Sequence, residues 1–181
     1  MQKPVTTDPS KLPYRRGVGL CLFNREGLVL VAERRDRPGA WQMPQGGINK
    51  EEELFAAALR ELKEEIGTDN ARIVGRVAEQ LTYEFPDWLQ FRGGVFRGKY
   101  RGQKQDWLAL NFLGEDGEID LSGEHEPENP EFISWRWAKL AETPSLVVDF
   151  KRSIYERVAA DFRAIEEALK RGEELPALGR L

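Results

Sequence analysis

Short apolar runs separated by polar turns characterise the first part of the chain. Residues 17–23 (GVGLCLF) and 28–33 (LVLVAE) are two such runs, joined by the residues NREG. Gly27 can adopt the positive φ that tight hairpin turns need, so the pattern predicts a β-hairpin. Later runs that are rich in β-branched and aromatic residues indicate further strands. They are RIVGRV (72–77), LTYEF (81–85), WLALNFLG (107–114) and EFISWRWA (131–138).

Between the hairpin and the later strands, the apolar positions take a helical spacing. Phe55, Ala58, Leu59, Leu62 and Ile66 recur at three- and four-residue steps. On a helix this spacing forms a single stripe that faces the core.

Capping signals mark both ends of this helix. Asn49 is a candidate N-cap, and Glu52 three residues later completes a capping box. Gly67 stands where a left-handed residue commonly ends a helix. These signals predict a helix from about Lys50 to Ile66.

A second amphipathic segment, residues 148–171, follows Pro144 and Ser145 and is expected to pack on the sheet. Strands interrupted by one early helix and closed by one late helix imply a mixed sheet with helices on both faces, a layered α/β architecture. The last ten residues, GEELPALGRL, show no periodicity, and we expect a loose tail there. The apolar face of the second helix consists of Phe150, Ile154, Val158, Phe162, Ile165 and Leu169.

The composition favours one folded domain. With 181 residues and 40% hydrophobic content, the chain can bury one sizeable core, and it has no long uncharged apolar run. The first ten residues lack the features of a secretory signal, so we expect a soluble, cytoplasmic protein. Cys21, the sole cysteine, is expected to be a small buried hydrophobe. The chain has a single histidine, His125, so a zinc site built from several histidines is excluded. His125 is expected on the surface.

Cations are concentrated in three places although the net charge is -4. Residues 88–105 contain no Asp or Glu, and shorter clusters lie at 34–37 and 15–16. Each cluster alone is typical of a solvated loop. Three of them beside an acidic helix favour a metal-bound polyphosphate, which needs both signs of charge. The cations of residues 88–105 are Arg92, Arg97, Lys99, Arg101 and Lys104, set among Phe91, Phe96 and Tyr100.

Three glutamates share one face of the predicted helix, because Glu61, Glu64 and Glu65 stand at positions i, i+3 and i+4. Each like-charged pair costs only about 0.2–0.5 kcal/mol on an exposed helix, so spacing alone leaves both a solvated helix and a metal site open. Mg²⁺ and Mn²⁺ take carboxylate and carbonyl oxygens. The glycine pair Gly46 and Gly47, just before the helix, can offer such a carbonyl, which favours a metal site.

The glycines and glutamates of this region carry a resemblance. Gly46, five further residues, Glu52, seven further residues and then RELKEEIG (60–67) resemble the Nudix box, the defining motif of the Nudix hydrolase superfamily. The last position departs from the motif, since Thr68 stands where the family prefers an aliphatic residue. That position packs in the family and does not bind metal.

The resemblance implies a Nudix-type α-β-α sandwich with a mixed β-sheet. We expect a Nudix domain at residues 13–171, an N-terminal extension at 1–12 and a C-terminal tail at 172–181. The implied reaction is the attack of water on a phosphorus of a nucleoside diphosphate linked to another group.

The resemblance also implies roles for the residues of the box. Glu61, Glu64 and Glu65 would bind Mg²⁺ or Mn²⁺ together with the carbonyl of Gly46, and we expect more than one ion in the substrate complex. Arg60 and Glu52 would form an ion pair that supports the loop and helix.

Beyond the box, the chain resembles the branch that holds bacterial RNA pyrophosphohydrolases and diadenosine polyphosphate hydrolases, over roughly residues 13–162. The resemblance implies that Glu131 is a further metal ligand or base, with Glu118 as the second choice. The matching segments are residues 14–27, 37–49, 102–114, 118–121, 129–138 and 147–158.

The same branch binds the 5′ end of its nucleotide substrate through arginine, lysine and apolar side chains. Asp106 is a departure, since relatives commonly have lysine there, and the acidic residue is expected to weaken the grip on a long polyanion. The matching substrate-binding candidates are Arg15, Arg35, Val148, Phe150 and Lys151, to which Lys104 is added from the cationic segment.

Three functions follow as hypotheses. The first is an RNA 5′-pyrophosphohydrolase, which converts a 5′-triphosphate to a 5′-monophosphate. The second is a dinucleoside polyphosphate hydrolase that releases ATP from diadenosine tetra- or pentaphosphate. The third is a non-catalytic Nudix-fold nucleotide-binding protein, which the intact set of glutamates disfavours. Neither DNA nor a membrane is expected as a partner.

Overall fold

The computed structural model describes residues 8–91, 98–122 and 130–179. Its strands form one sheet in the order β3-β2-β1-β7-β5, with β4 paired to β1, β6 to β7 and β8 to β2. The β1–β7 pair is parallel and the other pairs are antiparallel, so the sheet is mixed, as predicted. The strands are β1 (Tyr14–Phe23), β2 (Val29–Arg34), β3 (Trp41–Gln42), β4 (Gln45–Gly47), β5 (Ala71–Arg76), β6 (Leu81–Glu84), β7 (Gly102–Phe112) and β8 (Phe132–Ala138).

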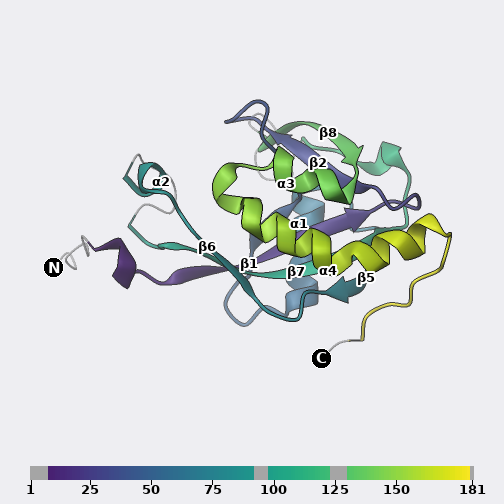
Figure 1. Cartoon of the computed structure of the whole chain (residues 1–181), viewed down its shortest axis with the longest axis horizontal. Helices are drawn as coiled ribbons and strands as arrows, with labels where there is room; N and C mark the ends of the chain where they lie inside the picture. The colour runs from purple at the N-terminus through teal and green to yellow at the C-terminus, as the bar shows by residue number, and fades with distance from the viewer. Residues whose placement is uncertain (1–7, 92–97, 123–129, 180–181) are drawn as a thin grey trace.

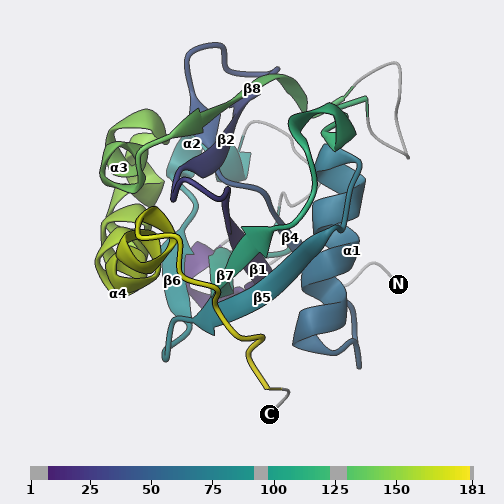
Figure 2. The ribbon, with the colours of Figure 1, turned by 90° about the vertical axis from the view of Figure 1, so that its right-hand side faces the viewer.

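Helices cover both faces of this sheet, which confirms the layered α/β fold. Figure 2 shows α1 on one side of the strands and α3 and α4 on the other. No helix in the described ranges is long and apolar enough to cross a membrane. The helices are α1 (Leu54–Ile66), α2 (Asp87–Phe91), α3 (Thr143–Leu146) and α4 (Arg152–Lys170).

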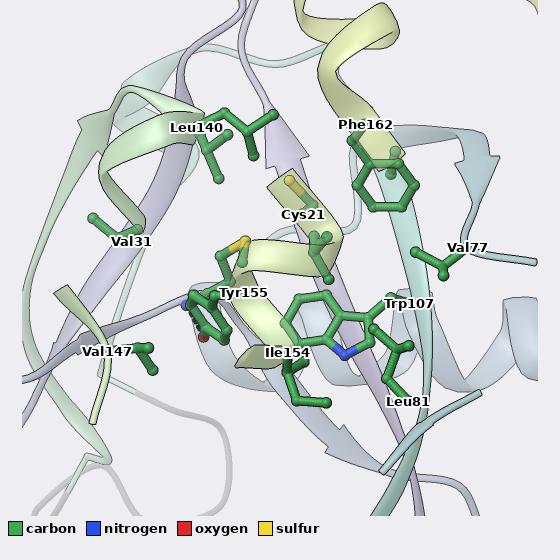
Figure 3. Close-up of a cluster of buried hydrophobic side chains, with 14 of the residues drawn as sticks. Cys21, Val31, Val77, Leu81, Trp107, Leu140, Val147, Ile154, Tyr155 and Phe162 are labelled. Carbon is green, nitrogen blue, oxygen red and sulfur yellow. Dashed lines mark hydrogen bonds between the residues drawn. The ribbon is translucent and has the colours of Figure 1, made fainter. Parts of the chain in front are cut away.

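The central strands are buried on both faces, so their side chains contribute alternately to two cores. Leu20 and Leu108 pack with α1, while Cys21 and Trp107 pack on the α4 side. Cys21 is fully buried, as expected. Figure 3 shows the α4-side core around Trp107, with Tyr155 of α4 beside it. This packing holds β1 and β7 in fixed register.

Helix α1 ends where the sequence predicts but begins later. Gly67 has a φ of 78° and its N–H donates to the carbonyl of Lys63, which confirms the predicted end. The predicted start at Lys50 is wrong, because Glu51 adopts a φ of 65° and breaks the helical path. The N–H of Asn49 does donate to Glu52 Oε2 (2.9 Å), but this contact closes a turn before the helix.

Several elements differ from the predicted ones. Strand β7 begins at Gly102, five residues before the predicted start, and β3 and β4 were not predicted. The predicted helix from residue 148 starts as a 3₁₀ turn at Asp149–Lys151 and continues as α4, while α3 lies before it and was not predicted. This turn is important because it carries two of the predicted substrate-binding residues.

The C-terminal segment is not the loose tail that we predicted. The N–H of Leu178 donates to the carbonyl of Ile73 (2.8 Å), and Arg72 Nη1 donates to the carbonyl of Leu175 (3.1 Å). The side chain of Leu175 packs against the α4-side core. Figure 1 shows this segment returning from the end of α4 past β5, where it covers part of the sheet edge.

Candidate active site

Strand β4 and helix α1 bring the Nudix-box residues together. A Cβ atom at Gly46 would lie 1.9 Å from the carboxyl group of Glu61, so only glycine permits this approach. Because β4 pairs with β1 in the sheet, the backbone of Gly46 is held opposite Val18. The glycine therefore places the main chain directly against the first glutamate.

The expected ion pair between Glu52 and Arg60 is present. Arg60 Nε donates to Glu52 Oε1 (2.7 Å) and Nη2 to Oε2 (2.8 Å), while Nη2 also donates to the carbonyl of Gly47 (2.9 Å). Hydrogen bonding from Arg60 lowers the pKa of Glu52 to about 2. The pair ties the loop before α1 to the helix.

Arg60 also contacts two of the predicted metal ligands. Its Nη1 donates to Glu61 (2.8 Å) and to Glu64 (3.2 Å). Burial raises the pKa of Glu61 above its ordinary value, although Arg60 opposes that shift. Glu61 and Glu64 thus share one guanidinium group.

Glu65 faces a different partner. Its Oε2 accepts a hydrogen bond from the backbone N–H of Gln45 (2.9 Å). Burial raises the pKa of Glu65 well above its ordinary value, and the negative charge of Glu131 adds to the shift. Glu65 and Glu131, far apart in the sequence, therefore act on each other in the folded chain.

The structure brings Glu131, and not Glu118, near Glu65. The carbonyl of Glu131 accepts from the N–H of Arg35 (2.9 Å), which fixes it just before β8. Burial of its carboxyl raises the pKa of Glu131, although the residue as a whole is exposed and nearby cations oppose the shift. Glu118 instead bonds Thr68 and Asn70 beyond the end of α1.

The glutamates have the oxygen donors that a hard divalent cation prefers, but their side chains are not arranged around a metal ion in this structure. In the described part of the chain, no three His, Cys, Asp or Glu side chains cluster closely enough to hold a metal ion as they stand. Arg60 Nη1 bonds Glu61 and Glu64, whereas Glu65 bonds the N–H of Gln45 instead, so the three helix carboxylates converge less than predicted. Carboxylates beside the open backbone of Gly46 are nevertheless the donor set that such cations prefer.

Lys151 projects from the 3₁₀ turn before α4 into a buried polar cluster. Its Nζ donates to Gln45 Oε1 (3.2 Å) and lies 5.4 Å from the centre of the Tyr83 ring. Burial lowers the pKa of Lys151 to about 8, an effect that the charge of Arg34 increases and the charges of Glu131 and Glu65 oppose. The amine of Lys151 is therefore close enough to Glu65 and Glu131 for their negative charges to act on it.

Arg34, rather than Arg35, belongs to this cluster. Arg34 donates to Asp36 (2.8 and 2.6 Å) and, through Nη1, to Gln42 Oε1 (3.2 Å). Its charge acts on both Glu131 and Lys151. The predicted residue Arg35 has an exposed side chain. The sequence analysis placed both arginines in one cationic cluster and chose Arg35 on the strength of the resemblance, because which of the two faces the site depends on the pairing of the strands.

Arg15 lies over the glycine strand. A Cβ atom at Gly47 would be 2.3 Å from Arg15 Nη2, and the positive charge of Arg15 opposes the shifts of Glu131 and Tyr83. Arg15 therefore joins the cluster, and its substrate-binding role stays a prediction. Gln45, which links Glu65 to Lys151, was missed because a lone glutamine carries no sequence signal.

The apolar candidates differ in exposure. Phe150 is half-buried, and its ring centre lies 5.8 Å from that of Tyr83. Val148 is buried in the α4-side core, so little of its surface faces solvent.

Lys104 does not join the other substrate-binding candidates. Gln103 and Gln105 bond to each other on one face of β7, so Lys104 between them points to the opposite face. The prediction for Lys104 is not supported by its position.

The position of Asp106 does not favour the expectation that it weakens the grip on a polyanion. Its carboxylate is buried and pairs with Arg76 Nη2 (2.6 Å) and Gln80 Nε2 (2.9 Å). A neutralised buried charge does not repel a polyanion at the surface. Four other residues of the sequence analysis lie outside the described residues, namely Arg92, Phe96, Arg97 and His125.

Comparison with known proteins decides the family. The NUDIX domain profile matches residues 13–158. The chain belongs to the Nudix family. Nudix hydrolases generally use divalent metal ions, in agreement with the donor set at Gly46 and the glutamates.

Curated relatives align with most of this Nudix chain. An RNA pyrophosphohydrolase of Rhodospirillum rubrum is 48% identical over 150 residues, which cover 83% of this chain and 87% of the relative. An RNA pyrophosphohydrolase of Gluconacetobacter diazotrophicus is 46% identical over 164 residues, covering 86% and 95%.

Solved structures share the Nudix fold at lower identity. The E. coli dihydroneopterin triphosphate pyrophosphohydrolase superposes with a TM-score of 0.61 at 20% identity, over 82% of this chain and 99% of that one. A C. elegans Ap4A hydrolase binary complex gives a TM-score of 0.54 at 16% identity, over 82% and 98%. These likenesses bear on the fold alone.

Proposed function

We propose that this Nudix chain is a metal-dependent pyrophosphohydrolase that converts 5′-triphosphorylated RNA to 5′-monophosphorylated RNA with release of pyrophosphate. The observation that carries the proposal is the placement of the basic residue Lys151 beside Glu65 and Glu131. A triphosphate that reaches the acidic residues meets cations at the same place. The relatives named RNA pyrophosphohydrolase, at 46–48% identity, support the choice of RNA.

We assign the metal-binding role to Glu61, Glu64, Glu65 and Glu131, with the carbonyl of Gly46. Mg²⁺ or Mn²⁺ suits these oxygen donors, and we propose more than one ion in the substrate complex. A bound ion lowers the pKa of a water molecule and neutralises phosphate charge.

The remaining residues bind and orient the substrate. Lys151, Arg15 and Arg34 offset the charge of phosphate oxygens that the glutamates would otherwise repel. Phe150, next to Tyr83, offers a half-buried ring against which the first base can stack. The proton lost by the attacking water passes to a carboxylate of the acidic group.

A dinucleoside polyphosphate hydrolase is the second candidate, because the same cations and rings suit an adenosine polyphosphate. The half-buried ring of Phe150, next to Tyr83, would also offer adenine a surface for stacking. A non-catalytic nucleotide-binding protein is the least favoured reading, because the chain retains the glutamates of the box.

Product analysis tests the proposed reaction. A 5′-triphosphorylated oligonucleotide is incubated with the enzyme and Mg²⁺, and the RNA end and released phosphates are identified by chromatography and mass spectrometry. We expect monophosphorylated RNA and pyrophosphate, and no reaction in excess EDTA. RNA that keeps its triphosphate in the presence of Mg²⁺ and Mn²⁺ would contradict the proposal.

A further inference from the structure

An exposed tryptophan lies next to the candidate active site. All five tryptophans fall within the described residues, and Trp88 alone is exposed, with 49% of its surface accessible. It belongs to the short helix α2, which Figure 1 shows beyond the end of β6. A single exposed apolar residue is ordinary, so its neighbours decide its meaning.

A row of aromatic rings connects Trp88 to the active site. The ring centre of Tyr83, near the Lys151 amine, lies 5.8 Å from that of Phe150. The ring of Phe150 lies 6.3 Å from that of Trp88 in an edge-to-face arrangement. The row therefore runs from the buried amine, past the half-buried Phe150, to the exposed indole.

A cation accompanies the exposed end of this row. The guanidinium carbon of Arg37 lies 5.8 Å from the centre of the Trp88 ring. Arg37 belongs to the loop between β2 and β3, which is anchored where the N–H of Ala40 donates to the Arg37 carbonyl (3.0 Å) and the N–H of Gly39 to Glu33 Oε1 (2.8 Å). Two segments distant in sequence thus place a positive charge and a stacking surface together.

This combination suits single-stranded nucleic acid. Proteins bind such strands with cations that meet the phosphates and aromatic side chains on which successive bases stack. An RNA held by its 5′ phosphates at the glutamates, with its first base at Phe150, would reach Trp88 next. A free mononucleotide has no second nucleotide that could contact Trp88.

We propose that Trp88 and Arg37 form a downstream subsite, which binds an RNA nucleotide 3′ to those held at the active site and so favours substrates several nucleotides long. The subsite rests on the proposed function, because that function fixes where the 5′ end lies. Trp88 supplies the stacking surface and Arg37 the contact to phosphate.

A binding assay without metal tests the subsite independently of turnover. Fluorescence anisotropy with 5′-monophosphorylated, 3′-labelled dinucleotides and hexanucleotides is measured in EDTA. We expect the hexanucleotide to bind at least about fivefold more tightly, with Trp88→Ala removing most of this advantage and Trp88→Phe keeping much of it. Arg37→Gln should weaken hexanucleotide binding and reduce the salt dependence by about one ion.

The cation–aromatic pair of Arg136 and Trp41 provides a matched control for Arg37 and Trp88. Arg136 lies 5.1 Å from the Trp41 ring, in a similar cation–aromatic pair outside the proposed row, so Arg136→Gln should keep the length advantage. Equal affinity for both lengths in the wild type, or an unchanged advantage in Trp88→Ala, would overturn the subsite.

Turnover of the same two lengths separates this inference from the proposed function. Triphosphorylated RNA converted without any length advantage in binding or turnover would leave the function standing and remove the subsite. A Trp88-dependent length advantage in binding without turnover would support the RNA surface and remove the proposed reaction.

Discussion

The candidate active site has two halves of different origin. The acidic half, Gly46, Glu61, Glu64 and Glu65, comes from strand β4 and helix α1 and is joined by Glu131 from just before β8. The basic half consists of Arg15, Arg34 and Lys151, with the rings of Tyr83 and Phe150, and it comes from β1, β2, β6 and the turn before α4. We assign chemistry to the first half and substrate binding to the second.

The acidic half is easier to predict from the sequence than the basic half. A helix fixes the relative places of residues three and four apart, so the acidic half is encoded within about twenty residues. The basic half depends on which strands pair, and no local pattern carries that information. Mutations should therefore separate the halves, with losses of turnover in one and losses of affinity in the other.

The largest effect is expected from the acidic half. Glu64→Gln and Glu65→Gln each remove one carboxylate charge with little change in shape, and kcat on triphosphorylated RNA should fall about 100- to 1,000-fold. Thermal melting should show that the fold persists. Glu53→Gln, at an exposed position just before α1, is the matched control and should retain its activity. Near-wild-type turnover in either active-site variant would end the metal assignment.

A substitution at Gly46 tests the role of the acidic half through the backbone. Gly46→Ala introduces a Cβ atom that would lie 1.9 Å from the Glu61 carboxyl, so either the strand or the carboxylate must move. Because such a displacement can cost about 100-fold, we expect a loss of that order in kcat. Gly117→Ala, where nothing lies within 4 Å of the added atom, is the control. If both variants turn over RNA equally well, the close approach at Gly46 has no catalytic role.

The basic half should affect affinity instead. Lys151→Met removes a buried positive charge beside the glutamates, and the KM for RNA should rise about tenfold or more with a smaller change in kcat. An effect confined to kcat would place Lys151 in the chemistry and blur the distinction between the halves.

The pH dependence of KM tests the charge of Lys151 itself. Burial lowers its pKa to about 8, so the charged form that binds phosphate prevails below that pH and is lost above it. The wild-type KM should therefore rise between pH 7 and pH 9. Lys151→Arg keeps its charge over this range, and its KM should rise less. Parallel KM profiles for the two proteins would show that another group is responsible.

The smallest effect on RNA is expected at Asp106, which lies outside both halves. Asp106→Asn breaks the buried contact with Arg76, so the free energy of unfolding should fall by about 1–3 kcal/mol, as measured by urea denaturation. The KM for RNA should stay within about twofold. A large fall in KM would mean that the negative charge does act on the substrate.

Local patterns predicted much of the fold. The apolar runs located most strands, and Gly67 marked the end of α1 because a left-handed residue was needed there. The start of α1 was missed because the left-handed conformation of Glu51 is set by the loop and not by its residue type. Strands β3 and β4, of two and three residues, are too short to show any periodicity.

Helical spacing placed Glu61, Glu64 and Glu65 on one helix, and the resemblance to the Nudix box paired Glu52 with Arg60 correctly. The resemblance pointed to Arg35, whereas the structure brings Arg34 to the cluster, because the choice depends on how β2 meets β8. The surroundings of Lys104 and Asp106 could not be predicted for a related reason. Both sit on the face of β7 opposite Gln103 and Gln105, and that orientation becomes known only with the sheet.

The central claim is that the two halves together act on the 5′ end of RNA. Its most direct test is kcat/KM measured under one set of conditions for a triphosphorylated RNA, diadenosine tetraphosphate and ATP. We predict the highest value for the RNA. A value for diadenosine tetraphosphate more than tenfold above that for RNA would contradict the account and favour the dinucleoside polyphosphate hydrolase.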